Sequence, residues 1–280
     1  MGSRRSLVAL GLLQASHPLP CLAVSGVAAG FAATSGYGLA DCLGIGATVL
    51  ASQLAIGWDN DYLDRHRDAA VGRPDKPLAT GAVRAGTVRA ASIAAAVVFL
   101  SSLLWYPAIA ALVAVIAAAA AAAYNRGLKA NALSPLPYAV SFGLLPAFVT
   151  LAGEPPAWPP AWIIGAAALL GVGAHFANAL PDIGDDLATG VAGLPARLGP
   201  RRAALAAAGS LAAAGVLLAT GAGLLGHPAG IGLLAVNLGL SAAIGAWPLR
   251  PGDRSKTPFR LAVAVAVLDV ALLLGSGAVA

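Results

Sequence analysis

Residues 60–68, Asn-Asp-Tyr-Leu-Asp-Arg-His-Arg-Asp, directly follow the apolar run 38–58. A second acidic stretch, Asn-Ala-Leu-Pro-Asp-Ile-Gly-Asp-Asp at residues 178–186, lies at the end of the apolar run 161–180. Each run has close to the roughly 20 residues that a helix needs to cross a bilayer. An acidic stretch at the end of a membrane-length helix, found twice, indicates a helical membrane protein with a polar site at one face.

The composition agrees with this interpretation, because 59% of the 280 residues are hydrophobic and only 10% are charged. Soluble domains carry about 25% charged residues. The runs are too long and unbroken for the alternating strands of an outer-membrane barrel. We therefore predict an all-α membrane protein, with residues 1–280 forming a single transmembrane domain. Its nine transmembrane helices are expected near 18–35, 38–58, 86–104, 107–124, 134–152, 161–180, 202–221, 228–247 and 258–278.

The basic residues predict the orientation of these helices. With nine spans, every Lys and Arg falls in a segment on the same side as the N-terminus: Arg4, Arg5, Arg65, Arg67, Arg73, Lys76, Arg84, Arg89, Arg126, Lys129, Arg197, Arg201, Arg202, Arg250, Arg254, Lys256 and Arg260. The positive-inside rule places this side in the cytoplasm, with residues 1–16 as a retained leader. The net charge of +5 is then an orientation signal, and we expect no nucleic-acid partner. The expected location is a cell membrane of the bacterial or archaeal type.

Both acidic stretches contain the spacing Asn-x3-Asp-x3-Asp. Residues four apart share one face of a helix, so two stripes are predicted: Asn60, Asp64 and Asp68, and Asn178, Asp182 and Asp186. Like charges on one face repel, and acids at a helix C-terminus oppose the helix dipole. A bound Mg²⁺ ion offsets the repulsion between the acids and their unfavourable interaction with the helix dipole, since it binds one or two carboxylates together with phosphate oxygens. A diphosphate held between the stripes fits this need; the alternative is that the acids are solvated and pair with neighbouring arginines.

Two basic segments lie near the acidic stretches in the predicted topology. Residues 73–81, Arg-Pro-Asp-Lys-Pro-Leu-Ala-Thr-Gly, form a proline-stiffened loop in which Arg73 or Lys76 can clamp a phosphate. Residues 124–129, Tyr-Asn-Arg-Gly-Leu-Lys, offer the Tyr124 hydroxyl and Lys129. Positive-inside anchoring is the alternative role for each basic residue.

These motifs resemble the two Asp-rich signatures of UbiA-type intramembrane prenyltransferases. Residues 73–81, 124–129 and 190–199 are similar to further segments of that family, so the resemblance covers nearly the whole chain. It implies an all-helical bundle around a central cavity, capped at the cytoplasmic face by two Asp-rich loops. Two departures, at Gly190 to Gly199 and at Ser16-His17-Pro18, leave the acceptor open.

The resemblance also implies roles for particular residues. The expected catalytic residues are Asp64, Asp68, Asp182 and Asp186. The expected Mg²⁺ ligands are Asn60, Asp64, Asp68, Asp182 and Asp186. The expected diphosphate contacts are Asn60, Arg67, Arg73, Lys129, Tyr124 and Asn178. The partners implied are an isoprenyl diphosphate, a small lipophilic acceptor and the lipid bilayer.

The expected reaction is Mg²⁺-dependent transfer of a prenyl group to an aromatic or quinone-precursor acceptor. Aromatic side chains can steady an allylic cation, and the candidates are Phe142, Phe148, Tyr138, Trp58 and Phe176, with plain packing as the alternative. The acceptor's proton is expected to pass to Asp182, Asp186 or Asp185. Prenyl transfer to a glycerophosphate, a terpene cyclase and a cation-coupled transporter remain open.

Three ionisable residues stand apart from these motifs. His17 and His175 lie at membrane boundaries, where each can contact an acceptor or simply pack. Asp269 lies within the last predicted span, where a carboxylate is costly, and a bonded, protonated state or a functional role are both open.

Overall fold

The structure is a computed structural model that describes residues 2–247 and 255–276. All regular secondary structure in this part of the chain is helical, as predicted. The basic residues Arg250 and Arg254 and the end of the ninth predicted run lie outside the described residues.

Each predicted apolar run contains a long helix in the described chain. These are α2 (Pro18–Thr34), α3 (Leu39–Ala70), α4 (Ala85–Ser102), α5 (Ala108–Asn125), α6 (Leu136–Leu151), α7 (Ala161–Ala179), α10 (Pro200–Gly221), α11 (Pro228–Gly245) and α12 (Thr257–Ser276). The shorter elements are α1 (Gly2–Ala15), α8 (Ile183–Ala188), α9 (Leu194–Leu198), η1 (Leu103–Trp105), η2 (Leu128–Ala130), η3 (Leu180–Asp182) and η4 (Leu224–Gly226).

Not every long helix is long and apolar enough to count as a span. Among the described residues, six helices meet this test by length and composition, or up to seven if the bent pair α1–α2 is one span. The protein is therefore an integral multi-pass membrane protein. The full count of nine spans stays a prediction, since α6 has only 16 residues.

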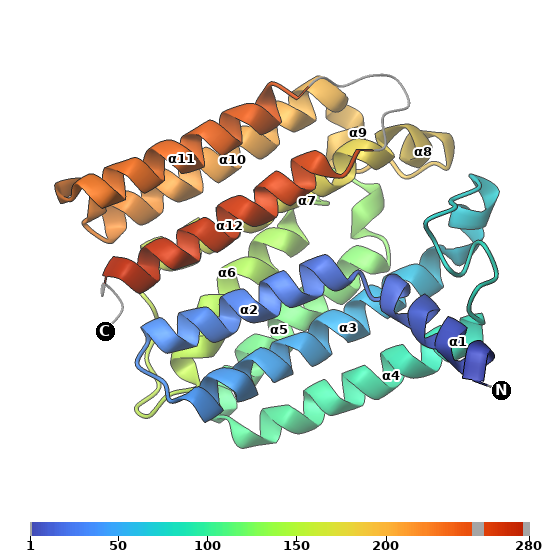
Figure 1. Ribbon diagram of the computed structural model, residues 1–280, viewed down its shortest axis with the longest axis horizontal. Coiled ribbons are helices and arrows are strands. Elements are labelled where there is room, and N and C mark those ends of the chain that lie inside the picture. The colour runs from blue at the N-terminus through green and yellow to red at the C-terminus, as the bar shows by residue number, and fades with distance from the viewer. Residues whose placement is uncertain (1, 248–254, 277–280) are drawn as a thin grey trace.

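The long helices pack side by side as a closed bundle (Figure 1). Helix α2 contacts α3 and α12, and the series α5, α6, α7, α10, α11 and α12 closes the other side. The connection from α3 to α4 lies at the same end of the bundle as α8, α9 and α1, whereas the α2–α3 and α10–α11 connections lie at the opposite end (Figure 1). Both acidic stretches are thus brought to one end.

The first Asp-rich segment is not a loop, which corrects the prediction. Helix α3 continues without a break through Asp68 to Ala70, because no Gly or Pro interrupts residues 58–71. The chain turns only at Gly72, whose φ is +62°. The second segment is also mostly helical: α7 ends at Ala179, and η3, which contains Pro181, leads into α8.

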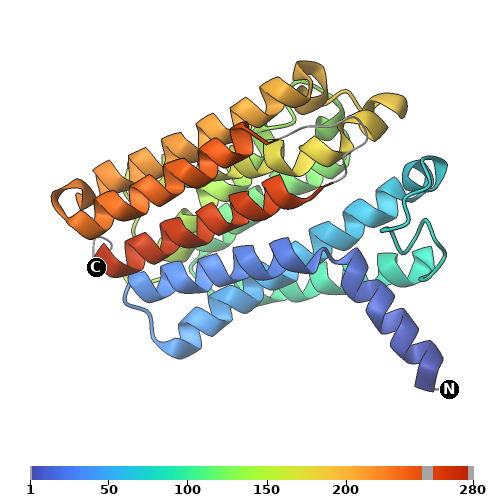
Figure 2. The ribbon, with the colours of Figure 1, turned by 45° about the horizontal axis from the view of Figure 1, so that its top comes forward.

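Helix α1 bends sharply into α2 (Figure 2). The angle between Val8–Ala15 and α2 is 60°. The bend falls at His17, which has left-handed backbone angles of φ 55° and ψ 64° and precedes Pro18 at the start of α2. The Trp58 indole N–H donates to the Leu12 carbonyl at 2.9 Å, so α1 is fastened to α3.

Small residues allow close helix contacts, as expected for a membrane bundle. A Cβ atom on Gly171 of α7 would lie 2.6 Å from the Tyr138 carbonyl oxygen of α6. A Cβ atom on Gly209 of α10 would meet no atom within 4 Å outside its own helix. Because Tyr138 lines the cavity described below, this α6–α7 contact also shapes the site.

We predict that Gly171→Ala destabilises the bundle by about 1–3 kcal/mol, the usual cost of overpacking. The added methyl group meets backbone, which cannot move aside as a side chain does. Thermal unfolding in detergent measures this as a lower Tm. Gly209→Ala is the matched control and should leave Tm unchanged or slightly higher; equal melting of the two variants would contradict the α6–α7 contact.

Candidate active site

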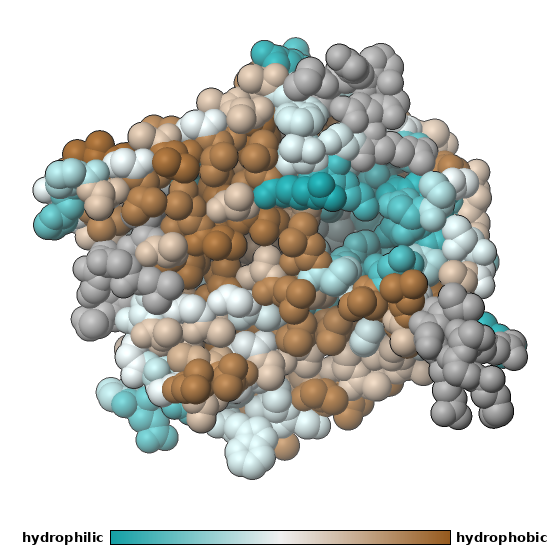
Figure 3. Space-filling view, in the orientation of Figure 1, coloured by the Kyte–Doolittle hydropathy of each residue, from teal (hydrophilic) through white to brown (hydrophobic). Residues whose placement is uncertain are grey.

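A cavity of about 560 Å³ opens between the helices near the end that carries the acidic stretches. Its hollow is lined by hydrophilic surface that borders directly on hydrophobic surface (Figure 3). The apolar part of the wall includes Val27 and Phe31 of α2, Leu145 of α6, and Val263 and Val267 of α12. The polar part contains every residue predicted as a catalytic residue, Mg²⁺ ligand or diphosphate contact: Asn60, Asp64, Arg67, Asp68, Arg73, Tyr124, Lys129, Asn178, Asp182 and Asp186. Asp185, the third candidate for accepting the acceptor's proton, is not among the lining residues.

Arg67 joins the two acidic stripes. Its Nη2 donates to Asp64 Oδ2 at 3.0 Å, and its Nη1 donates to Asp186 Oδ1 at 3.4 Å. Lys129 Nζ donates to the other Asp64 oxygen. Asp68 is 3% exposed, and its Oδ1 lies 3.9 Å from Arg67 Nη2. Residues more than a hundred positions apart therefore share one guanidinium at the polar end of the cavity.

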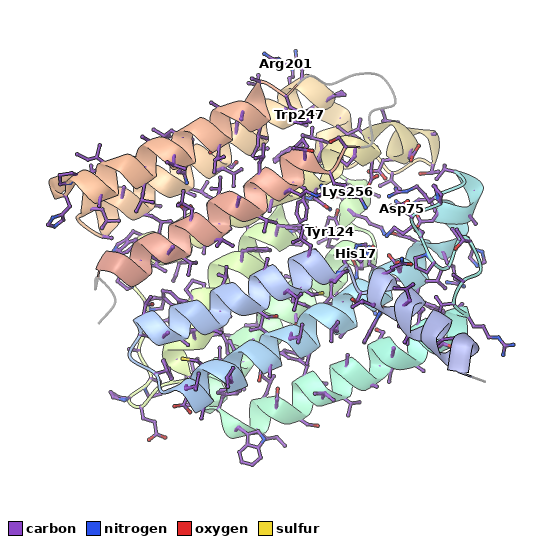
Figure 4. All side chains as sticks on the ribbon, in the orientation of Figure 1. His17, Asp75, Tyr124, Arg201, Trp247 and Lys256 are labelled. Carbon is purple, nitrogen blue, oxygen red and sulfur yellow. The ribbon has the colours of Figure 1, made fainter. Side chains whose placement is uncertain are left out.

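Arg73 makes the second link between the stripes. Its Nη1 donates to Asp182 Oδ1 at 2.9 Å, while its Nε and Nη2 donate to the two Asp75 oxygens at 2.9 and 3.0 Å. Lys256 reaches Asp75 from the start of α12 at 3.2 Å, and Figure 4 labels both side chains. The hydrogen bonds from Arg73 hold the pKa of Asp75 well below its ordinary value, and Asp75 in turn raises the pKa of Arg73. The α3–α4 loop is thereby tied to both α7–α8 and α12.

The two asparagines of the stripes occupy different settings. Asn60 donates its amide to Asn125 Oδ1 at 3.1 Å, and Asn125 donates to the Ile56 carbonyl at 3.0 Å. This chain of amides fixes the end of α5 against α3. Asn178 lies exposed on the last turn of α7 and faces the cavity.

The aromatic candidates divide into two groups. Tyr138 and Phe142 line the cavity, with nearly parallel rings whose centroids are 6.1 Å apart. Trp58, Phe148 and Phe176 do not line it, which agrees with the packing alternative for these three. Trp58 packs on α1, and the other two belong to the buried apolar clusters, because an aromatic on a membrane helix has several faces to pack against.

The isolated ionisable residues all reach the cavity wall. His17, His175 and Asp269 are among its lining residues. Asp269 is 1% exposed and accepts hydrogen bonds from the Asn237 amide at 2.9 and 3.2 Å. This contact agrees with the bonded state considered for Asp269.

Sequence reasoning missed several contacts of the site. Asn125 lies within the segment 124–129, in which only Tyr124 and Lys129 were predicted to belong to the site. Lys256 is 181 residues from Asp75, so no local pattern connects them. The contact of His17 with Asp61 joins residues 44 positions apart and has no local signal either.

The fold and the site define a helical membrane protein whose cavity combines a charged end with an apolar body. The sequence model of the UbiA prenyltransferase family matches residues 19–266. The chain belongs to this family, and the family resemblance found in the sequence is confirmed. No curated protein matches the chain significantly.

Solved structures share the fold. The apo structure of a UbiA homolog from Aeropyrum pernix K1 is 23% identical, with a TM-score of 0.72, and the match covers 92% of this chain and 96% of that one. A UbiA homolog from Archaeoglobus fulgidus bound to GPP and Mg²⁺ is 18% identical, with a TM-score of 0.72 and coverage of 96% and 99%. A digeranylgeranylglyceryl phosphate synthase is 16% identical, with a TM-score of 0.65 and coverage of 96% and 98%.

We predict that Arg67→Gln weakens binding of a prenyl diphosphate by about 10- to 100-fold, the range for loss of one charged hydrogen-bonding group. Binding of labelled geranylgeranyl diphosphate to detergent-solubilised protein measures the effect. Arg65→Gln is the matched control, because Arg65 binds the Tyr62 carbonyl and ring outside the cavity. Equal affinities for the two variants would show that the link between the stripes has no part in binding.

Proposed function

We propose that this protein transfers a prenyl group from an isoprenyl diphosphate to an aromatic or quinone-precursor acceptor inside the membrane. The observation that carries this proposal is the division of one cavity into two parts. Acids and bases from α3, α7–α8 and the α3–α4 loop meet at one end, and apolar side chains line the remainder. An amphiphilic ligand with a diphosphate head and a hydrocarbon tail matches this division.

The residues present fit Mg²⁺. Within the described chain, no three His, Cys, Asp or Glu residues lie close enough together to enclose a metal by themselves. Mg²⁺ does not need such a set, since it keeps several waters and binds one or two carboxylates plus substrate phosphates. Asn60, Asp64 and Asp68 on one side, and Asp182 and Asp186 on the other, supply hard oxygen ligands. When bound, Mg²⁺ neutralises charge on the departing diphosphate.

The basic residues have a distinct task in this proposal. Arg67, Arg73 and Lys129 already contact the acids, so they are preorganised where negative charge collects as the C–O bond of the allylic diphosphate breaks. Tyr138 and Phe142 offer ring faces that stabilise positive charge on the prenyl carbon. The surrounding apolar wall excludes water and protects the cation from hydrolysis. Tyr124 and Asn178 complete the proposed diphosphate contacts.

A second acceptor class is a glycerophosphate. It is favoured by the structural similarity to a digeranylgeranylglyceryl phosphate synthase. The distribution of basic residues supports a cytoplasmic location for the polar end, so a water-soluble acceptor has access to it.

We expect Asp64→Asn to lower kcat/KM for prenyl transfer by at least about 100-fold, the scale for loss of one electrostatic contact to the transition state. The assay combines purified protein, labelled geranylgeranyl diphosphate and Mg²⁺ with 4-hydroxybenzoate, 1,4-dihydroxy-2-naphthoate or glycerol phosphate. Chelation of Mg²⁺ should abolish transfer by the wild type.

Asp41→Asn is the control for this assay. Asp41 lies in the first turn of the same helix, exposed and outside the cavity, so the change removes an equal charge far from the site. Release of diphosphate in the absence of any acceptor would indicate cyclase or hydrolase chemistry. A wild type that neither binds nor cleaves the diphosphate would refute the proposed function.

A further inference from the structure

A second polar cluster, formed by His17, Asp61 and Lys76, lies beside the diphosphate end of the cavity. His17 and Lys76 line the cavity, and Asp61 lies on the turn of α3 that also carries Asn60 and Asp64. His17 Nε2 is 2.8 Å from Asp61 Oδ1, and Lys76 Nζ is 2.6 Å from the same oxygen. None of the proposed Mg²⁺ or diphosphate contacts uses His17.

The hydrogen bonds decide which ring nitrogen of His17 carries the proton. An ionised carboxylate only accepts and an ammonium group only donates. Nε2 therefore donates its hydrogen to Asp61, and Lys76, at 3.3 Å from the same Nε2, serves Asp61 as a second donor. In the neutral ring, Nδ1 then keeps a free lone pair. A histidine oriented by a carboxylate in this way is suited to accept a proton.

The surroundings of Asp61 hold this carboxylate in place against the ring of His17. Asp61 is 1% exposed, and its Oδ2 is buried with no hydrogen-bond partner in the described structure. Its charge is shared between Lys76 and His17 through Oδ1 alone. Asp61 therefore fixes the ring through one oxygen atom, at which His17 and Lys76 meet.

The backbone of His17 has an unfavourable, left-handed conformation. Left-handed angles are unfavourable for a residue other than glycine, because the Cβ atom comes too close to the following carbonyl oxygen. The strained turn is packed on α3, where a Cβ atom on Gly57 would lie 2.9 Å from the Ser16 carbonyl oxygen. The His17 side chain nevertheless remains 36% exposed, so a ligand in the cavity can reach it. A strained residue fixed by its neighbours and open to a cavity is typical of a functional position.

The carboxylates near the reacting end already have other partners. Asp182 accepts a hydrogen bond from Arg73 and Asp186 accepts one from Arg67, and both carboxylates are also proposed Mg²⁺ ligands. Transfer of a prenyl group to a neutral hydroxyl acceptor must release a proton, so a group at the reacting end has to accept it.

We propose, on the basis of the prenyl-transfer function above, that His17 is the catalytic base and that the acceptor is a hydroxyl compound bound with its O–H directed at Nδ1. Asp61 is the positioning residue that fixes the ring. The C–O bond of the prenyl diphosphate breaks and its electron pair stays on the diphosphate. The acceptor's hydroxyl oxygen, or the ring carbon conjugated with it, forms the new bond to the prenyl carbon, and the hydroxyl proton moves to Nδ1.

The test uses His17→Gln, whose amide can still donate to Asp61 from near the Nε2 position but offers no base at Nδ1. With the hydroxyl acceptors named above, kcat should fall by about 10²- to 10⁴-fold, the usual contribution of general base catalysis. The Kd for geranylgeranyl diphosphate with Mg²⁺ should stay close to that of the wild type. In His17→Ala, added imidazole should restore at least a tenfold increase in transfer, which it should not do in His17→Gln. His227→Gln, at the opposite end of the bundle, is the matched control.

The outcomes separate this inference from the proposed function. Unchanged kcat in His17→Gln overturns it, and so does a loss of kcat that imidazole fails to restore in His17→Ala. A wild type that binds and cleaves the diphosphate but transfers to none of the hydroxyl acceptors overturns the acceptor class. A wild type that does not bind the diphosphate refutes the proposed function itself.

Discussion

The pairing of partly buried acids with arginines at one end of an apolar bundle is the interaction on which the rest of the structure depends. Charged groups are costly next to a membrane interior unless they are paired. Arg67 meets this need for Asp64 and Asp186, and Arg73 meets it for Asp182. Because Arg67 of α3 and Arg73 of the α3–α4 loop both reach acids that follow α7, the contacts that neutralise these acids also bring the two halves of the chain together around the cavity.

This arrangement gives the cavity its chemical character. The basic side chains that pair with the acids are already directed toward the polar end. They therefore need little rearrangement when the more highly charged diphosphate group binds there. Below them the wall is apolar and contains the rings of Tyr138 and Phe142. The loop carrying Arg73 is tied to α12 through Asp75 and Lys256, which adds a third element to the charged network at this end of the bundle.

The extent to which the site could be predicted depended on the sequence distance between contacting residues. The stripe of Asn60, Asp64 and Asp68 follows from helical periodicity, and these residues lie together on α3. The end of α3 was misplaced because hydropathy marks where apolar residues stop, whereas a helix stops where the backbone is interrupted. The sequence did not separate aromatic residues that line the cavity from those that pack elsewhere, because it does not show which face of a helix meets the cavity. Phe142 lines the cavity, whereas Phe148 does not.

The sequence by itself determined the helical membrane class, the first acidic stripe and the family, because helix periodicity, span length and local motifs are properties of short segments. The predicted second stripe is divided among α7, η3 and α8. The tertiary structure alone decided which base meets which acid and that His17 lies against Asp61, 44 residues away. It also decided that α3 carries its stripe on an unbroken helix. The physical reason is that bundle packing sets these contacts through close approaches such as Gly57 to Ser16, and no local pattern in the chain encodes them.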